Sequence, residues 1–178
     1  GQSTDIATRY LADKLSQSMG QSFVVENRAG ASGNIGTAQV ARSAPDGYTL
    51  LMGTSATHAL NPALYKSPGY DAQKDFEPIM LTALIPFAIS AGADSKFNSL
   101  EDLLAQAKKQ PGKIEAALPS VTGQLVLEML KQRDVPLFGV KFKGSADAMT
   151  NTLGGHVPVL VDTVAATRTQ LGKIKVLA

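Results

Sequence analysis

The sequence predicts an α/β fold in two lobes, with parallel or mixed sheets and flanking helices. Short β-rich segments alternate with helical segments along the 178 residues, which is the pattern of a sheet covered by helices. Hydrophobic residues make up 44% of the chain and charged residues 18%, so it can bury a core. Pro86 interrupts a long apolar stretch, and the alternation begins again after it. We therefore predict lobes at residues 1–85 and 86–178, with a crossing near 84–92 and a return near 173–178.

The first half is predicted to hold two helices and three strands. Ser3-Thr4-Asp5 places hydroxyls and an acid at a helix start, where they satisfy free N–H groups and favour the helix dipole. Apolar residues then recur at helical spacing as far as Gly20, a residue type that commonly ends helices. The predicted second helix covers residues 34–42, and the predicted strands cover 23–25, 48–52 and the part of 78–91 that precedes Pro86.

The second half is predicted to be a regular β–α series. Ser99-Leu100-Glu101-Asp102 resembles a capping box, and Pro111-Gly112 ends the helix that follows it. Glycines mark the ends of two later helices, at Gly154-Gly155 and at Gly172. The predicted strands cover 87–91, 114–118, 138–142, 157–161 and 174–177, and the predicted later helices cover 122–131, 145–153 and 163–171.

Composition excludes several classes of function. The chain has no cysteine, which rules out disulfides, thiolate zinc sites, iron–sulfur clusters and a cysteine nucleophile, and is compatible with an oxidising compartment. The net charge is only +2 and the basic residues are scattered, so nucleic acid is not an expected partner. No apolar run reaches the roughly 18 residues of a membrane span.

Catalytic and cofactor motifs are also missing. The two histidines lie far apart, no phosphate-binding loop of the G-x-x-x-x-G-K-[ST] type is present, and residues 53–57 lack the last glycine of a G-x-S-x-G elbow. Gly30 to Gly36 follows a predicted strand but has G-x-x-G-x-x-G spacing, which favours a structural turn over a dinucleotide site. We therefore predict no catalytic residue, metal or cofactor, and no enzymatic activity.

Helix starts at strand ends are the best candidates for binding an anion. Ser3-Thr4, Thr122-Gly123 and Gly144-Ser145 each begin a predicted helix, which offers free N–H groups and the positive end of a helix dipole. In an α/β fold, ligands bind where strands end and helices begin. For each of these positions alone, ordinary helix capping is the favoured explanation, because every helix needs a cap.

Two further residues have a structural and a functional interpretation. Asp162 follows the apolar run 157–161, so it caps the helix that begins at Thr163, contacts a ligand or water, or does both. We expect it to orient the ligand by accepting a hydrogen bond. His58 follows Thr54-Ser55, and because no acid is placed beside it, a structural hydrogen bond is favoured over a role as a base.

Several motifs, in order along nearly the whole chain, resemble the extracytoplasmic solute receptors of tripartite tricarboxylate transporters, the Bug-type receptors. The first is Glu26-Asn27-Arg28-Ala29-Gly30-Ala31-Ser32-Gly33-Asn34-Ile35-Gly36. The second is Ala44-Pro45-Asp46-Gly47-Tyr48-Thr49-Leu50-Leu51-Met52-Gly53. The resemblance continues through residues 58–65, 75–78, 142–144 and 153–155.

The resemblance implies a two-lobed periplasmic binding protein of type II. Such a receptor closes on a small carboxylate (a dicarboxylate, tricarboxylate, amino acid or related organic acid) in an interlobe cleft and delivers it to permease subunits in the membrane. We expect a periplasmic monomer. Matching the ligand loops of the family position by position implies the following ligand-binding residues: Ser3, Thr4, Asp5, Thr54, Ser55, His58, Ser120, Thr122, Gly123, Lys143, Gly144 and Asp162.

The chain departs from the family pattern in two places. Family members have an apolar strand and a Pro-Gly-Gly loop before the position of Gly1 and continue beyond Ala178, so we expect an incomplete fragment whose first lobe lacks its first strand and its C-terminal return. The segment 117–125 is shorter than in the family and has no histidine. Two other functions remain open: the ligand-sensing domain of a transcription regulator, and an α/β enzyme of the hydrolase or nucleotide-dependent type.

Overall fold

A computed structural model describes residues 3–178 of the chain. The chain divides into two compact units, which contain Ser3–Ala83 and Leu84–Ala178. The second unit is a mixed α/β layer structure, as the sequence predicts, and the first is built from helices and irregular segments. Each unit is described by itself.

The second unit contains a five-stranded sheet in the order β3-β2-β4-β1-β5. Strand β2 (Glu115–Leu118) runs parallel to β3 (Phe138–Lys141) and to β4 (Val159–Thr163). Strand β1 (Phe87–Gly92) runs antiparallel to β4 and to β5 (Ile174–Val176). The three parallel strands therefore end at one edge of the sheet, while β1 ends at the opposite edge.

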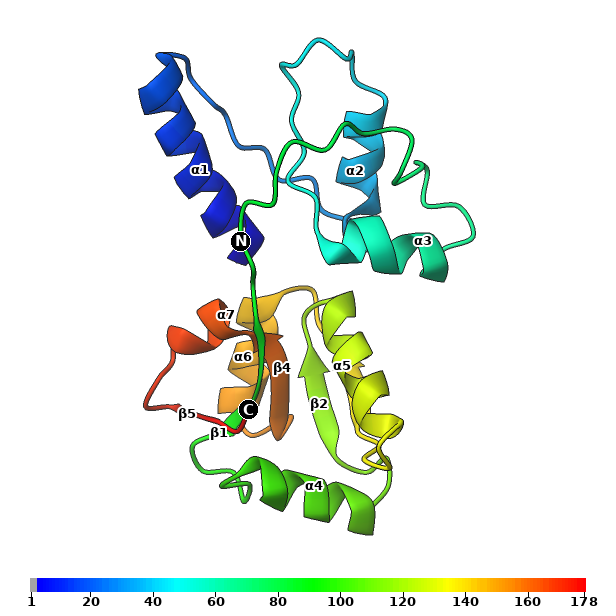
Figure 1. The fold of residues 1–178 in the computed structure, drawn as a ribbon. Coiled ribbons are helices and arrows are strands. Elements are labelled where there is room, and N and C mark those ends of the chain that lie inside the picture. The colour runs from blue at the N-terminus through cyan, green and yellow to red at the C-terminus, as the bar shows by residue number, and fades with distance from the viewer. Residues whose placement is uncertain (1–2) are drawn as a thin grey trace. The chain divides into compact units, whose positions relative to one another are not determined.

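Helices cover both faces of this sheet (Figure 1). On one face, α4 (Leu100–Lys109) and α5 (Val121–Lys131) bury side chains against β1, β2 and β4. On the other face, α6 (Ser145–Leu153) packs against Ala117 and Leu160. The short helix α7 (Val164–Arg168) contacts β1 and β4. The hydrophobic core of this unit therefore lies in two layers, one on each side of the sheet.

The helix ends of the second unit follow the local signals in the sequence. Ser99 Oγ accepts from Asp102 N at 3.2 Å, and Asp102 Oδ2 accepts from Asn98 N at 3.2 Å. These two contacts are the reciprocal pair of a capping box. Thr163 Oγ1 accepts from Ala166 N at 3.3 Å at the start of α7. The predicted interval 145–153 coincides with α6, and the other three predicted helices differ by a few residues.

Replacing Ser90 by alanine is expected to raise the free energy of unfolding by about 1 kcal/mol, because a buried hydroxyl with no hydrogen bond is destabilising. Ser90 is fully buried on β1, and its hydroxyl has no partner among the described residues. Urea denaturation followed by circular dichroism measures the effect. Thr152→Val is the contrast, since it removes a buried hydroxyl that donates to Ala148 O at 3.0 Å. Equal effects of the two substitutions would contradict the prediction.

The first unit contains α1 (Ser3–Met19) and α2 (Asn34–Ala41), with a 3-10 turn at Ala31–Gly33 directly before α2. A π-helical turn at Ala56–Leu60 continues into the short helix α3 (Asn61–Leu64). The predicted helices in this unit are confirmed within a few residues. Among the apolar residues described in Ser3–Ala83, Ala38 is the one that is buried, with 8% of its surface exposed.

The three strands predicted before Pro86 are wrong. Residues 23–25, 48–52 and 78–85 lie outside any described helix or strand. Val24 and Tyr48 have exposed fractions of 87% and 92%. A strand exists only when a neighbour pairs with its N–H and C=O groups, and the described part of this unit supplies no such neighbour. The local β propensity of these segments is therefore not realised.

Candidate functional site

The candidate site lies at the edge of the second unit where the three parallel strands end. Strand β2 leads into α5, β3 into α6 and β4 into α7. Because β2 lies between β3 and β4 in the sheet, these connections are neighbours. This is the edge at which ligands bind in sheets of this kind.

Ser120 immediately precedes α5, and its buried hydroxyl has no hydrogen-bond partner in the part of the chain that the structure describes. It occupies the N-cap position with an extended backbone, but its side chain makes no capping hydrogen bond. By contrast, the side chains of Ser99 and Thr163 do cap α4 and α7. A serine at an N-cap ordinarily accepts from an N–H of the first turn. The start of α5, which includes Thr122 and Gly123, therefore has no side-chain cap from Ser120.

Gly123 lets α5 approach the sheet closely. A Cβ atom at this position would lie 3.2 Å from Val161 O on β4 and 3.2 Å from Leu118 Cδ2 on β2. A larger residue would have to push the helix start away from the strands. The sequence names Gly123 as a ligand residue, and the structure also gives it a packing role.

Helix α6 begins at Ser145, whose hydroxyl is also buried and makes no hydrogen bond with any described residue. Gly144 occupies the N-cap position of α6 in an extended conformation, with a φ angle of 177°. Because glycine has no side chain, it gives this helix no side-chain cap. The exposed side chain of Lys143 forms no ion pair among the described residues. The sequence names Gly144-Ser145 as a helix start but does not include Ser145 among the ligand residues. Only the fold brings its hydroxyl beside Asp162.

Asp162 lies inside β4 and not after it, because the strand covers Val159–Thr163 where 157–161 is predicted. The capping interpretation is therefore wrong for Asp162, since Thr163 is the residue that caps α7. Asp162 is buried, with 2% of the residue's surface exposed. Its Oδ1 accepts from Thr163 N at 2.6 Å, and its Oδ2 has no partner among the described residues.

The pKa of Asp162 is raised above its usual value because burial disfavours the charged form. The hydroxyl of Ser145 and hydrogen bonding from Thr163 offset part of this rise. Ser145 therefore lies close to the carboxyl group, although the two do not meet the geometry of a hydrogen bond. Ser120, Ser145 and Asp162 each have a buried side-chain oxygen that makes no hydrogen bond with the described residues, and Ser145 is the one of the two serines shown close to Asp162.

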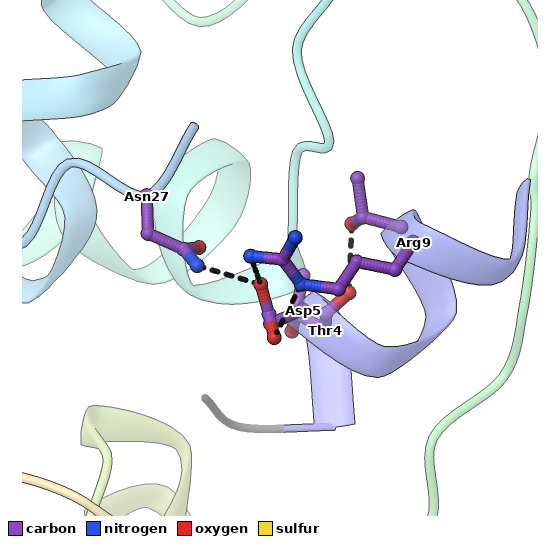
Figure 2. Close-up of polar contacts among 5 residues, drawn as sticks. Thr4, Asp5, Arg9 and Asn27 are labelled. Carbon is purple, nitrogen blue, oxygen red and sulfur yellow. Dashed lines mark hydrogen bonds and ion pairs between the residues drawn. The ribbon is translucent and has the colours of Figure 1, made fainter. Parts of the chain in front are cut away.

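In the first unit, Asp5 joins α1 to the segment that follows it. Its carboxylate accepts from Asn27 Nδ2 at 2.6 Å and from Arg9 Nε at 3.2 Å, as Figure 2 shows. Both hydrogen bonds lower the pKa of Asp5, and the hydrogen bond from Asn27 has the larger effect. Thr4 O accepts from Thr8 Oγ1 at 2.7 Å, and Ser3 is buried. Gly1 and Gln2, which begin this predicted ligand loop, lie outside the described residues.

Thr54, Ser55 and His58 surround the start of the π-helical turn. Thr54 N donates to Thr57 Oγ1 at 3.1 Å, and the same hydroxyl lies 2.9 Å from His58 Nδ1. The His58 ring meets the Phe76 ring edge-on at a centroid distance of 5.0 Å. Ser55 is exposed. These contacts bear out the structural hydrogen bond favoured for His58.

A buried polar network in the same unit was not predicted from the sequence. Asn61 Nδ2 donates to Asn34 Oδ1 at 2.6 Å and to Ser32 O at 3.0 Å, and the Tyr70 hydroxyl donates to Asn34 Oδ1 at 2.9 Å. Ala31 and Ser32 have positive φ angles of 44° and 57°, which are unfavourable for residues with a side chain. The network holds the glycine-rich loop in this conformation, so the loop is a structural turn as the sequence favours.

Among the described residues, no group of three or more histidine, aspartate or glutamate side chains is arranged to hold a metal ion. Within the same residues, no helix is both long enough and apolar enough to cross a membrane.

Comparison with known proteins confirms the resemblance seen in the sequence. Residues 7–178 match the model of the tripartite tricarboxylate transporter family receptor. Protein BugT of Bordetella pertussis is 36% identical over 184 residues, which cover 100% of this chain and 56% of BugT. The chain spans about half of the length of the curated relatives that it matches.

Solved structures agree with this assignment and confirm the fold class. R. palustris Rpa4515 with adipate superposes with a TM-score of 0.93 at 35% identity, covering 99% of this chain and 61% of that one. MatC from Rhodopseudomonas palustris with bound malate has a TM-score of 0.85 at 27% identity, covering 100% of this chain and 62% of that one. The fold, the order of motifs and the family match agree, and the chain therefore belongs to the tripartite tricarboxylate transporter receptor family.

Proposed function

We propose that this chain binds a small organic carboxylate at the strand-end edge of its second unit. The observation that carries the proposal is that Ser120, Ser145 and Asp162, near the ends of neighbouring strands, each have a buried side-chain oxygen without a hydrogen bond to the described residues. The uncapped starts of α5 and α6 add free N–H groups and the positive ends of two helix dipoles. The adipate and malate found with the two similar structures support a carboxylate as the ligand class.

Residues from both units are proposed as ligand contacts. In the second unit these are Ser120, Thr122, Gly123, Lys143, Gly144 and Asp162, to which the structure leads us to add Ser145. In the first unit they are Ser3, Thr4, Asp5, Thr54, Ser55 and His58. The boundary between the two compact units falls after Ala83. This boundary supports the proposal that the units correspond to two lobes, at residues 1–85 and 86–178.

We propose that the whole protein is a periplasmic, monomeric receptor that passes its ligand to permease subunits in the membrane. Membership of the receptor family supports this role. The protein is proposed to bind without catalytic turnover, so a dicarboxylate incubated with it should be recovered unchanged. Nuclear magnetic resonance of the incubated ligand measures this directly.

Calorimetric titration of the chain with adipate and malate tests the proposed site. Ser120→Ala is expected to weaken binding about tenfold, because a hydrogen bond to a charged ligand contributes about 1.5 kcal/mol. Ser99→Ala is the matched control, since Ser99 caps α4 and follows β1 at the opposite edge of the same sheet. It should cost about 1 kcal/mol of stability and leave affinity unchanged.

Two results would contradict the proposed function. One is the absence of saturable binding for every member of a panel of dicarboxylates and tricarboxylates. The other is an equal loss of affinity in Ser120→Ala and Ser99→Ala, which would place the ligand away from the strand-end edge.

A further inference from the structure

The carboxyl group of Asp162 is buried next to groups that do not neutralise it. It lies on β4 between β1 and β2, opposite Ala88 of β1. Its Oδ1 accepts from Thr163 N, and its Oδ2 has no hydrogen-bond partner among residues 3–178. No ion pair of the described residues includes Asp162.

Charged side chains on the neighbouring elements do not compensate for this burial. Strand β1 carries no titratable residue. The titratable residues on the other elements packed against β4, and on the loop before α6, are Glu115 on β2, Glu128 and Lys131 on α5, Asp147 on α6, Arg168 on α7, and Lys143. Burial raises the pKa of Asp162, the nearby Ser145 hydroxyl and the hydrogen bond from Thr163 N offset part of this rise, and no neighbouring charge contributes to the shift.

An arriving carboxylate would make the charged form of Asp162 still less favourable. Two carboxylates that share a buried site cannot both stay ionised at low cost, so one of them holds a proton. A protonated carboxyl group donates one hydrogen bond, whereas an ionised one only accepts. The unpartnered Oδ2 is the atom free to carry that proton.

We propose that ligand binding by the second unit takes up one proton at Asp162. The proton comes from solvent, bonds to Oδ2, and is donated in a hydrogen bond to a carboxylate oxygen of the ligand, which remains ionised. The proposal rests on the proposed function and assigns Asp162 a donor role in place of the accepting role expected from the sequence. Binding should therefore weaken as the pH rises through the range in which Asp162 of the free protein loses its proton.

Calorimetry with adipate at pH 6 and pH 8 tests this inference. The affinity of the unmodified chain is expected to be lower at pH 8 than at pH 6. Titrations in buffers with different ionisation enthalpies should show net proton uptake on binding. This measurement needs no variant, so it does not depend on the folding of one.

Asp162→Asn is the matched variant, because its amide keeps an acceptor for Thr163 N and adds a permanent N–H donor. It should bind adipate at both pH values with the same affinity within about twofold, and without linked proton uptake. Protonation of adipate itself affects both proteins equally, so the difference between them isolates Asp162.

The possible failures are distinguishable. Binding of adipate by the unmodified chain with no proton uptake, together with at least tenfold weaker binding by Asp162→Asn, would overturn this inference and leave the proposed function standing. It would mean that Asp162 acts as a charged acceptor. No binding of adipate, or of any acid in the panel, by either protein at either pH would overturn both proposals.

Discussion

Phe97→Ala is expected to lower the free energy of unfolding of the second unit by about 3–5 kcal/mol, the usual cost of removing a buried phenylalanine side chain. Phe97 has no exposed surface and packs with Leu103, Ile89 and Val159 in the core layer between the sheet and helices α4 and α5. Alanine would remove the ring and leave a cavity that the surrounding strands cannot fill. Urea denaturation followed by far-ultraviolet circular dichroism measures the loss.

Phe138→Ala is the matched control for this prediction. Phe138 lies on the edge strand β3 with 56% of its surface exposed, so its loss should cost less than 1 kcal/mol. All four tyrosines precede Leu84, and tyrosine fluorescence therefore reports on the first unit alone. A loss below 1 kcal/mol for Phe97→Ala, or equal losses for the two variants, would show that the core layer is not packed as described.

Gly123→Val is expected to weaken adipate binding at least tenfold and to cost about 1–3 kcal/mol of stability. The branched side chain would overlap the positions of Val161 O and Leu118 Cδ2, each of which lies 3.2 Å from an ideal Cβ at this site. Overpacking of this kind moves backbone, and here the displaced groups are the start of α5 and the strand that carries Asp162. Calorimetry measures the affinity, and thermal denaturation the stability.

The control for Gly123→Val is Gln124→Val, which adds the same branched side chain at an exposed position on the same helix. It should change the affinity by less than about twofold and the stability by less than about 1 kcal/mol, the scale of a helix-propensity difference. If both variants lose affinity equally, the effect belongs to helix propensity and not to the close approach of α5 to β4.

The helices could be predicted from the sequence because their signals are local. Ser99 with Asp102 marks the start of α4, and Gly154 follows the end of α6, as the structure confirms. The strands of the second unit were found for a related reason, since each has a partner within the same unit. The shift of β4 by two residues shows the limit of this approach, because register is set by the neighbours Ala116 and Ala88 and not by β4 itself.

The failed strands of the first unit have the opposite cause. The residues around Val24, Tyr48 and Leu81 carry β propensity, but their side chains are exposed and their backbone has no strand partner in the part of the chain that the structure describes. The local composition of a segment does not indicate whether a partner strand is present. The buried contacts of Asn34 and Asn61 were missed for the same reason, since residues far apart in sequence form them.

The sequence by itself determined the family, the α/β class and the strand-end positions from which we propose that the ligand is bound, because these depend on the order of motifs and on local helix and strand signals. The tertiary structure alone decided the state of the groups at those positions. It left Ser120 without its capping bond, brought the Ser145 hydroxyl beside Asp162, and buried that carboxyl group with an oxygen unpartnered. The physical reason is that burial and hydrogen-bond satisfaction depend on the packing of β2, β4 and α6 around one point, and residues distant in sequence meet there only when the sheet has formed.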